Sequence, residues 1–253
     1  MIILRRALSA EALKLRHTLG LWLIWLAPLV IIVLTVVQFS FQKTHGPMGL
    51  TPVKAWMNFC RGIFTIWCVL MLPLFVTLQA ALLAGLEHGN QQWKHLLALP
   101  VPHWSHYAAK ALMLALMVVA STLLLCVMTP LVGWILMYTK PDYGVAWPAP
   151  WGWLLMHSLE CIAASSLLVG LHTWVAIRWN SFTTAIGVGV AGTVAGFLIC
   201  QSEKLGPWFP WSMAAQTVSG NEQRAMLAIV VSLIGGALTG AIGLWDYARR
   251  EYA

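Results

Sequence analysis

The sequence predicts an all-α integral membrane protein with six transmembrane helices. Hydrophobic residues make up 60% of the chain and charged residues only 9%, and the mean hydropathy is +0.77. This composition leaves too few polar side chains to cover a soluble globular surface. The apolar residues fall into runs of about 20, the length that a helix needs to cross about 30 Å of hydrocarbon. We therefore expect one membrane domain over residues 1–253.

Each apolar run is expected to be helical, because lipid offers the backbone no other hydrogen-bond partner. The six expected spans cover residues 20–41, 60–86, 107–138, 153–177, 181–200 and 225–245. Before them, Leu4, Leu8 and Leu15 recur at helical spacing, whereas Arg5 and Arg16 fall on other sides. Residues 1–19 are therefore expected to form an interfacial helix that leads into the first span.

Charge placement predicts that both termini lie in the cytosol. An even number of spans puts the termini on one side, and that side carries nine Lys and Arg residues against six opposite. The nine are Arg5, Arg6, Lys14, Arg16, Lys94, Lys110, Arg178, Arg249 and Arg250. The net charge of +7 is spread thinly at span ends with no basic run. This pattern favours membrane lipid as a partner and gives no indication of nucleic-acid binding.

The connection between spans 2 and 3, residues 87–106, is a polar segment on the same side as the termini. It can form a short helix that carries Trp93, Leu96 and Leu97 on one side and ends at Pro100. Such a helix could insert an apolar knob into a groove of a soluble partner. A surface connection without a partner is the alternative.

A second unusual connection, residues 201–224, joins spans 5 and 6 on the opposite side. It places Pro207 and Pro210 next to Trp208 and Trp211. The prolines interrupt a helix, while the segment stays apolar enough to approach lipid. We expect a re-entrant or surface-lying segment here.

Three of the ionisable residues within the apolar runs are the clearest functional candidates. His157 and Glu160 lie one helical turn apart in span 4, and Arg61 lies near the outer end of span 2. Such residues are functional candidates because they are costly to place in a membrane. Two interpretations remain open. One is a buried ion pair or hydrogen bond, with Glu160 facing Arg61, that locks spans 2 and 4 together; the other is a proton or substrate site.

Motifs for catalysis and metal binding are missing from the sequence. There is no phosphate-binding loop and no zinc-hydrolase or serine-hydrolase motif. The histidines of residues 87–106 have no Cys or carboxylate companions at ligand spacing, so no metal site is expected. Gly192 and Gly196 form a small-x-x-x-small face, which predicts close helix packing, either within the chain or at a seam between subunits.

Several segments along the chain together resemble the permease subunit of a type-2 ABC exporter, in particular the lantibiotic-immunity and bacitracin-resistance type. They are A-E-A-L-K-L-R-H-T at 10–18, L-A-P-L at 26–29, E-H-G-N-Q-Q-W-K-H-L-L-A-L-P-V-P at 87–102 with Lys110 after it, P-W-F-P-W at 207–211, and W-D-Y-A-R-R-E at 245–251. The resemblance covers nearly the whole length, although no single segment is diagnostic.

The resemblance implies a multi-pass subunit of the bacterial cytoplasmic membrane with two copies of a separate ABC ATPase as partners. That ATPase would bind ATP and Mg, so this chain would hold no cofactor and no catalytic residue. The cytosolic connection would be a coupling helix, with the role falling to Glu87, Gln91, Trp93, Lys94, Leu96, Leu97 and Pro100. The segment at 201–224 would form an outer gate through Pro207, Trp208, Pro210 and Trp211.

The resemblance also implies that the first and fifth spans face a second permease, identical or homologous, across a central pathway. The cargo expected from the aromatic and apolar spans is an amphipathic peptide or lipid-like molecule. Two other functions remain open from the residues alone. One is a proton-coupled secondary transporter that uses His157 and Glu160, and the other is a membrane enzyme that acts on lipid.

Overall fold

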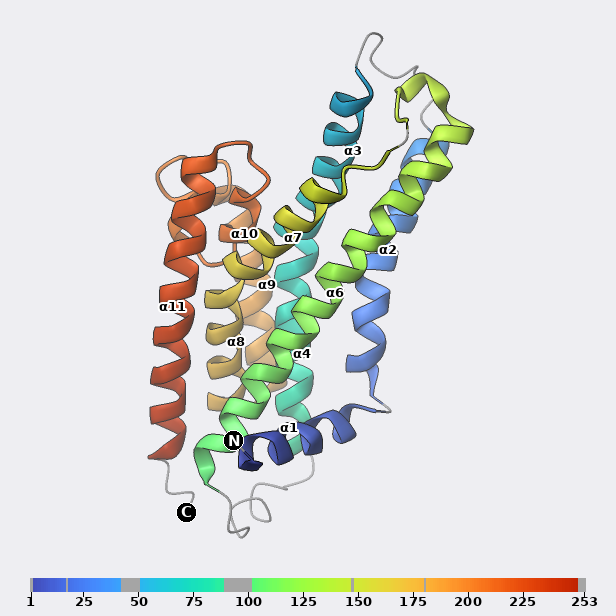
Figure 1. The fold of residues 1–253 in the computed structure, drawn as a ribbon. Helices are drawn as coiled ribbons and strands as arrows, with labels where there is room; N and C mark the ends of the chain where they lie inside the picture. The colour runs from blue at the N-terminus through green and yellow to red at the C-terminus, as the bar shows by residue number, and fades with distance from the viewer. Residues whose placement is uncertain are drawn as a thin grey trace.

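The computed structural model describes residues 2–16, 18–41, 51–88, 102–146, 148–179 and 181–249, and these residues form helices and turns without a strand (Figure 1). The elements in chain order are α1 (Ile2–Leu15), α2 (Leu19–Phe41), α3 (Pro52–Ile66), the π-helical turn η1 (Trp67–Met71), α4 (Leu72–His88), α6 (His103–Thr139), the short η2 (Pro141–Tyr143), α7 (Trp151–Ala164), α8 (Ser166–Arg178), α9 (Phe182–Ile199), the short η3 (Gly206–Trp208), α10 (Met213–Gln216) and α11 (Glu222–Ala248).

Within the described ranges, six segments are long and apolar enough to cross a membrane. They are Leu19–Phe41, Pro52–Gly85, Trp104–Thr139, Trp151–Arg178, Phe182–Ile199 and Glu222–Ala248. Each contains or nearly matches one of the runs expected from the sequence. The prediction of an all-α integral membrane protein with six spans is confirmed.

The second span begins earlier than the apolar run suggested. Its helix starts at Pro52 rather than near residue 60. Proline suits the first turn of a helix, because its missing N–H has no partner there in any case. The added turns are amphipathic and bury Trp56 and Phe59, so packing extends the helix beyond the continuous apolar stretch.

The fourth span is interrupted at Ser165, which separates α7 from α8. A neighbouring helix provides hydrogen-bond partners for backbone groups at the break. The Ser232 hydroxyl of α11 donates to the Ala164 carbonyl at 2.8 Å and accepts from the Leu167 N–H at 3.0 Å. Backbone groups freed inside a membrane span need such partners. Hydropathy alone could not place this break.

The continuous helix α3–η1–α4 is the central column of the bundle. In its span, 61% of the most apolar window is buried, against 11% in α11. Phe64, Trp67 and Leu72 are fully buried, and α4 contacts α2, α6, α8 and α9. The core therefore lies around this column, and α11 presents most of its surface outward.

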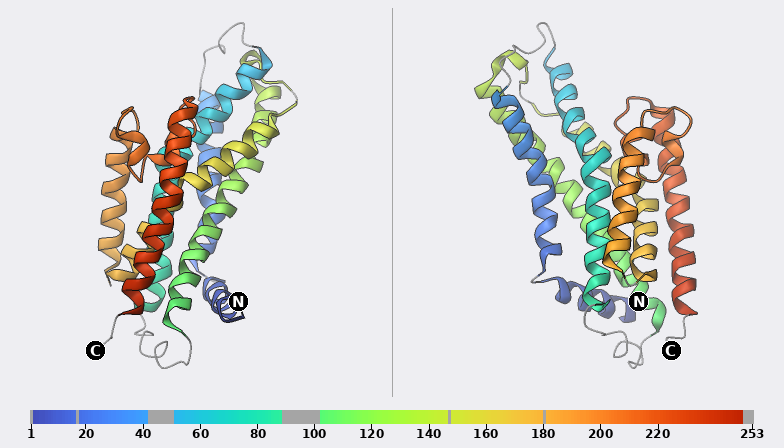
Figure 2. Two further views of the ribbon diagram at one scale, coloured as in Figure 1. Left: turned by 60° about the vertical axis from the view of Figure 1, so that its left-hand side comes forward. Right: turned by 180° about the vertical axis from the view of Figure 1, so that it is seen from behind.

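Helix α1 lies across one end of the bundle, at a steep angle to the spans (Figure 2). The end of α11 lies at this same end (Figure 1), which we call the termini end. The opposite end, where η2, η3 and the start of α11 lie, is called the far end.

Candidate functional site

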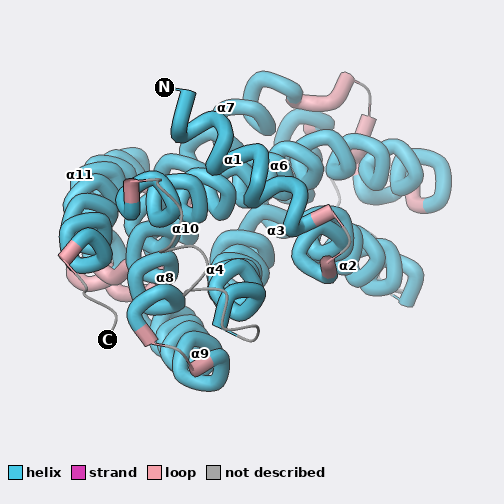
Figure 3. Tube along the Cα trace, turned by 90° about the horizontal axis from the view of Figure 1, so that it is seen from below, coloured by secondary structure: helices cyan, strands magenta, loops and turns pink. Residues whose placement is uncertain are grey.

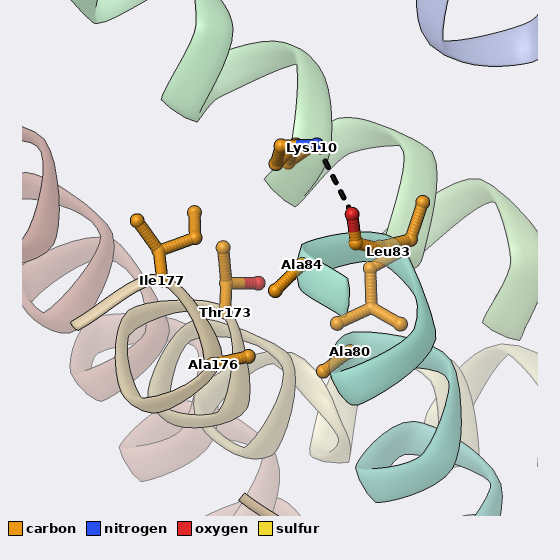
Figure 4. Close-up of a pocket in the computed structure, with 8 residues that line it drawn as sticks. Ala80, Leu83, Ala84, Lys110, Thr173, Ala176 and Ile177 are labelled. Carbon is orange, nitrogen blue, oxygen red and sulfur yellow. Dashed lines mark hydrogen bonds between the residues drawn. The ribbon is translucent and has the colours of Figure 1, made fainter. Parts of the chain in front are cut away.

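A buried charged cluster joins α1 to two spans at the termini end. The Glu11 carboxylate accepts hydrogen bonds from Lys14 Nζ at 2.7 Å and from Lys110 Nζ at 3.0 Å. Lys110 also donates to the backbone carbonyl of Leu83 at 3.2 Å (Figure 4). Glu11 belongs to α1, Lys110 to α6 and Leu83 to α4, so these contacts connect three helices. We call Glu11, Lys14 and Lys110 the Glu11 cluster.

The electrostatics of the Glu11 cluster favour its ionised form. Glu11 and Lys110 are each only 3% exposed. Burial by itself raises the pKa of the Glu11 carboxyl, but the charges and hydrogen bonds of Lys110 and Lys14 outweigh it, and the pKa lies below its usual value. Removing one partner of such a pair would leave the other charge buried without compensation.

The three spans beside Lys110 pack closely. The cavity between α4, α6 and α8 has a volume of about 10 Å³ and is lined by Ala80, Leu83, Ala84, Lys110, Leu114, Thr173, Ala176 and Ile177 (Figure 4). This is at the lower limit of the volume that holds one water molecule. This cavity is too small for a solute, so the contacts around Lys110 hold α4, α6 and α8 together and do not form a binding site.

A second polar contact joins α8 to α11 at the same end. The Asp246 carboxylate accepts a hydrogen bond from the Trp174 indole N–H at 3.1 Å and lies 3.7 Å from Arg178 Nε. Together with the Glu11 cluster, it connects α1, α4 and α6 on one side and α8 and α11 on the other through polar side chains.

The residues expected to couple to a partner fall mostly outside the described ranges. Residues 89–101 lie outside the described ranges, and they include Gln91, Trp93, Lys94, Leu96, Leu97 and Pro100. Only the backbone of Glu87 is described, in the last turn of α4. The helices on either side of this connection are described. Leu83 is close to the end of α4, and Lys110 is two turns into α6, so the Glu11 cluster contacts both helices that flank the connection.

The intramembrane residues Arg61, His157 and Glu160 surround one cavity near the far end, with a volume of about 570 Å³. His157 Nδ1 lies 4.0 Å from Glu160 Oε2 and 3.1 Å from the Trp153 carbonyl, and its ring stacks on the Trp153 indole at 3.9 Å. No ion pair joins Arg61 to Glu160 in the described part of the chain. The three residues line one cavity, but the interpretation of an ion pair between spans 2 and 4 is not met in the described residues.

The connection at the far end, residues 201–224, folds back into the bundle. Pro207 is buried, Trp208 is exposed, and Pro210 and Trp211 are half-buried. Two side chains fix the fold: the Ser212 hydroxyl donates to the Gly206 carbonyl at 2.7 Å, and Gln216 Nε2 donates to the Cys200 carbonyl at 3.0 Å. Helix α10 is buried throughout. The segment is thus a packed cap, and its role as a gate remains a prediction.

Gly192 and Gly196 of α9 make room for Trp211. A Cβ atom added at Gly192 would overlap the indole ring, and one added at Gly196 would lie 2.9 Å from Trp211 Cβ. Trp211 also meets the buried His172 ring edge to face, with 5.7 Å between centroids. The small-residue face therefore packs within the chain, and a subunit seam at this face remains a prediction.

Sequence reasoning missed the central role of Glu11 and Lys110. In the sequence, Glu11 is only one charge among several in the expected interfacial helix, and Lys110 only marks the start of a span. Among the described residues, no group of three or more His, Cys, Asp or Glu side chains is placed to hold a metal ion.

Comparison with known proteins identifies the family. A family model described as an ABC-2 family transporter protein matches residues 7–196, which run from α1 into α9. No curated protein and no solved structure matched the chain. The matched range includes the whole Glu11 cluster and both helices that flank residues 89–101. With six helices suited to span a membrane and a family match over most of its length, this chain belongs to the ABC-2 family of transporter proteins, as a multi-pass membrane component.

Proposed function

We propose that this chain forms the translocation pathway of an ATP-driven exporter for an amphipathic peptide or lipid-like substrate. It acts in the bacterial cytoplasmic membrane with both termini in the cytosol. Two copies of an ABC ATPase drive it, and a second permease, identical or homologous, completes the pathway. Protection against antimicrobial peptides is the physiological role that the lantibiotic-immunity and bacitracin-resistance resemblance favours.

The observation that carries this proposal is the Glu11 cluster. It links α1 to α4 and α6, the two helices that flank residues 89–101. A partner that pushes on this connection therefore displaces α1, α4 and α6 together. Since α4 belongs to the central column of the bundle, that displacement reaches the core of the protein.

The energy source lies in another chain. The sequence contains no phosphate-binding loop, and membership of the ABC-2 family implies pairing with an ABC ATPase. ATP binding would close the ATPase pair against the connection between α4 and α6, and the spans would tilt toward an outward-open pathway. Nothing covalent happens to the cargo.

The arrangement of α2 and α9 supports a pathway between two permeases. These helices, the first and fifth spans, lie on either side of α4 (Figure 3). Only 22% and 28% of their most apolar windows are buried within this chain. A second permease facing this side would cover part of these surfaces, and exposed aromatic side chains such as Trp22 and Trp25 suit an amphipathic cargo.

The partner is tested by changing the expected coupling helix. Trp93→Ala combined with Leu96→Asp removes the apolar knob and should abolish co-purification with the partner ABC ATPase, while membrane insertion stays intact. Trp179→Ala is the matched control, because Trp179 is an exposed aromatic residue at the end of α8 and should leave association unchanged. Undiminished co-purification of the double variant would contradict the assignment.

A proton-coupled secondary transporter is the second candidate, because His157 and Glu160 line one cavity. The two mechanisms differ in their energy source. In vesicles that contain the permease and its ATPase, an exporter keeps transporting with ATP when a protonophore collapses the pH gradient. Transport that stops with the protonophore, and continues without ATP when a gradient is imposed, would establish the second candidate.

A further inference from the structure

The cavity at the far end has the composition of a binding site. It lies between α3, α7, α11 and the turn that precedes α11 (Figure 1 shows α7 passing obliquely between α3 and α11). Its volume of about 570 Å³ falls within the range of small-molecule sites. The lining is Met57, Arg61, Trp153, Met156, His157, Glu160, Thr217, Gly220, Asn221, Glu222, Ala225, Met226 and Ile229. We call it the polar cavity.

The polar cavity contains charges of both signs that do not pair with each other. The Arg61 guanidinium lies over the turn at Gly220, where an added Cβ would be 3.9 Å from both of its terminal nitrogens. Among the described residues, Arg61 has no hydrogen bond and no ion pair, and its side chain is exposed. The Glu160 carboxylate lies 4.0 Å from His157 Nδ1. A ligand that carries both signs would give Arg61 and Glu160 each a partner of opposite charge at this end of the spans.

The balance of charge selects among such ligands. The titratable lining residues are one arginine, one histidine, His157, and two carboxylates, Glu160 and Glu222. A purely anionic ligand would pair with Arg61 but would meet both carboxylates, and a purely cationic one would meet Arg61. A zwitterion avoids both conflicts. A primary ammonium can also donate hydrogen bonds to Glu160, which a quaternary ammonium cannot do.

A shallow apolar groove on the surface of α11 adjoins the polar cavity. It is lined by Glu222, Gln223, Met226, Leu227 and Val230, all of α11. It shares Glu222 and Met226 with the polar cavity. The groove ends at Val230, one residue beyond Ile229 of the cavity lining. Cavity and groove therefore lie side by side on the first part of α11, which runs from the far end to the termini end (Figure 2). The part of an acyl chain next to its headgroup would lie against these apolar side chains.

We propose that the polar cavity and the α11 groove bind one zwitterionic aminophospholipid of the phosphatidylethanolamine class. Arg61 binds the phosphate, for which a guanidinium fork is well suited, and Glu160 binds the primary ammonium. Met226 and Val230 contact an acyl chain. The site does not include α2 or α9, and it is independent of the proposed export function, because lipid binding can be measured without ATPase or cargo.

The test is native mass spectrometry of the full chain in detergent, titrated with phosphatidylethanolamine, phosphatidylcholine and phosphatidylglycerol of identical acyl chains. Phosphatidylethanolamine should bind most tightly. Arg61→Gln should weaken its binding about tenfold, as expected for one lost charge-assisted contact. Glu160→Gln should remove the preference for phosphatidylethanolamine while binding of the other lipids is retained.

Two further variants separate lipid binding from folding. Lys54→Gln removes a positive charge from α3 outside the cavity and should leave all three affinities unchanged. Met226→Trp fills the junction of cavity and groove without altering a charge, and should weaken all three lipids alike. Thermal midpoints of the variants show whether each remains folded.

The proposal is overturned if Arg61→Gln and Lys54→Gln bind lipid equally well, or if the wild-type chain does not prefer phosphatidylethanolamine. It is also overturned if a cationic amphipathic peptide occupies the cavity. In that case photo-crosslinking from Met226 would capture the peptide, Glu160→Gln would weaken capture, and Arg61→Gln would strengthen it.

Discussion

Glu11 is the residue on which the arrangement of the termini end depends most. Its carboxylate is almost fully buried and holds Lys14 of its own helix and Lys110 of α6. Lys110 in turn binds the backbone of α4. An exposed ion pair would contribute little to stability, but a buried one makes each partner strongly dependent on the other.

Glu11→Gln should therefore be markedly destabilising. It leaves the Lys110 ammonium buried without its carboxylate, which costs about 3–5 kcal/mol. The measurement is the free energy of unfolding, or the thermal midpoint, of the purified chain in detergent. Lys14→Gln is the matched control, since Lys14 is 28% exposed and losing a partly solvated partner costs about 1 kcal/mol or less. Equal losses in the two variants would contradict the buried pair.

The stability that Glu11 contributes should also depend on pH. Because the pKa of its carboxyl is lower in the folded chain than the ordinary value of 4.5, the contribution is fully present above about pH 4.5 and is lost as the pH falls through the folded pKa. Thermal midpoints of the wild type and of Glu11→Gln should therefore differ at pH 7 and approach each other as the pH falls below 4.5 and through the folded pKa. A difference that persists unchanged in acid would refute the linkage.

Among the elements, the connection between α9 and α11 depends on a glycine face. Trp211 fits against Gly192 and Gly196, and α10 follows as a buried single turn. The sequence indicated the two components of this contact separately, as a glycine face and as a Pro- and Trp-rich segment. Tertiary packing decides which side chain fills the space beside the glycines, and the spacing of the glycines in the sequence does not reveal it.

Gly192→Ala should destabilise the packing of Trp211. The added methyl group overlaps the indole, and overpacking of this kind costs about 1–3 kcal/mol. Gly187→Ala in the same helix is the control, because nothing lies within 4 Å of a Cβ added there. Unfolding measured for both variants should show a loss only for the first. Gly192→Ala and Trp211→Ala combined should cost less than the sum of their separate losses, and strict additivity would argue against the contact.

For the whole molecule, the sequence was sufficient for the class of fold and the approximate spans. Helix length and apolar composition are local properties, and the membrane requires both. The interruption at Ser165 depends on Ser232 of a distant helix, and the Glu11 cluster joins residues 99 positions apart. Such pairings between distant helices leave no periodic signal in the sequence, so the Glu11 cluster could not be predicted from residue spacing.

The central claim at this scale is that the movement of the spans is powered by a partner ATPase through the connection between α4 and α6. The most direct test uses proteoliposomes that contain the permease alone, or the permease with its ATPase, and a fluorescent amphipathic peptide as cargo. The account predicts uphill transport only when ATPase and ATP are both present, and its loss in the Trp93→Ala, Leu96→Asp variant. Uphill transport by this chain alone would contradict it.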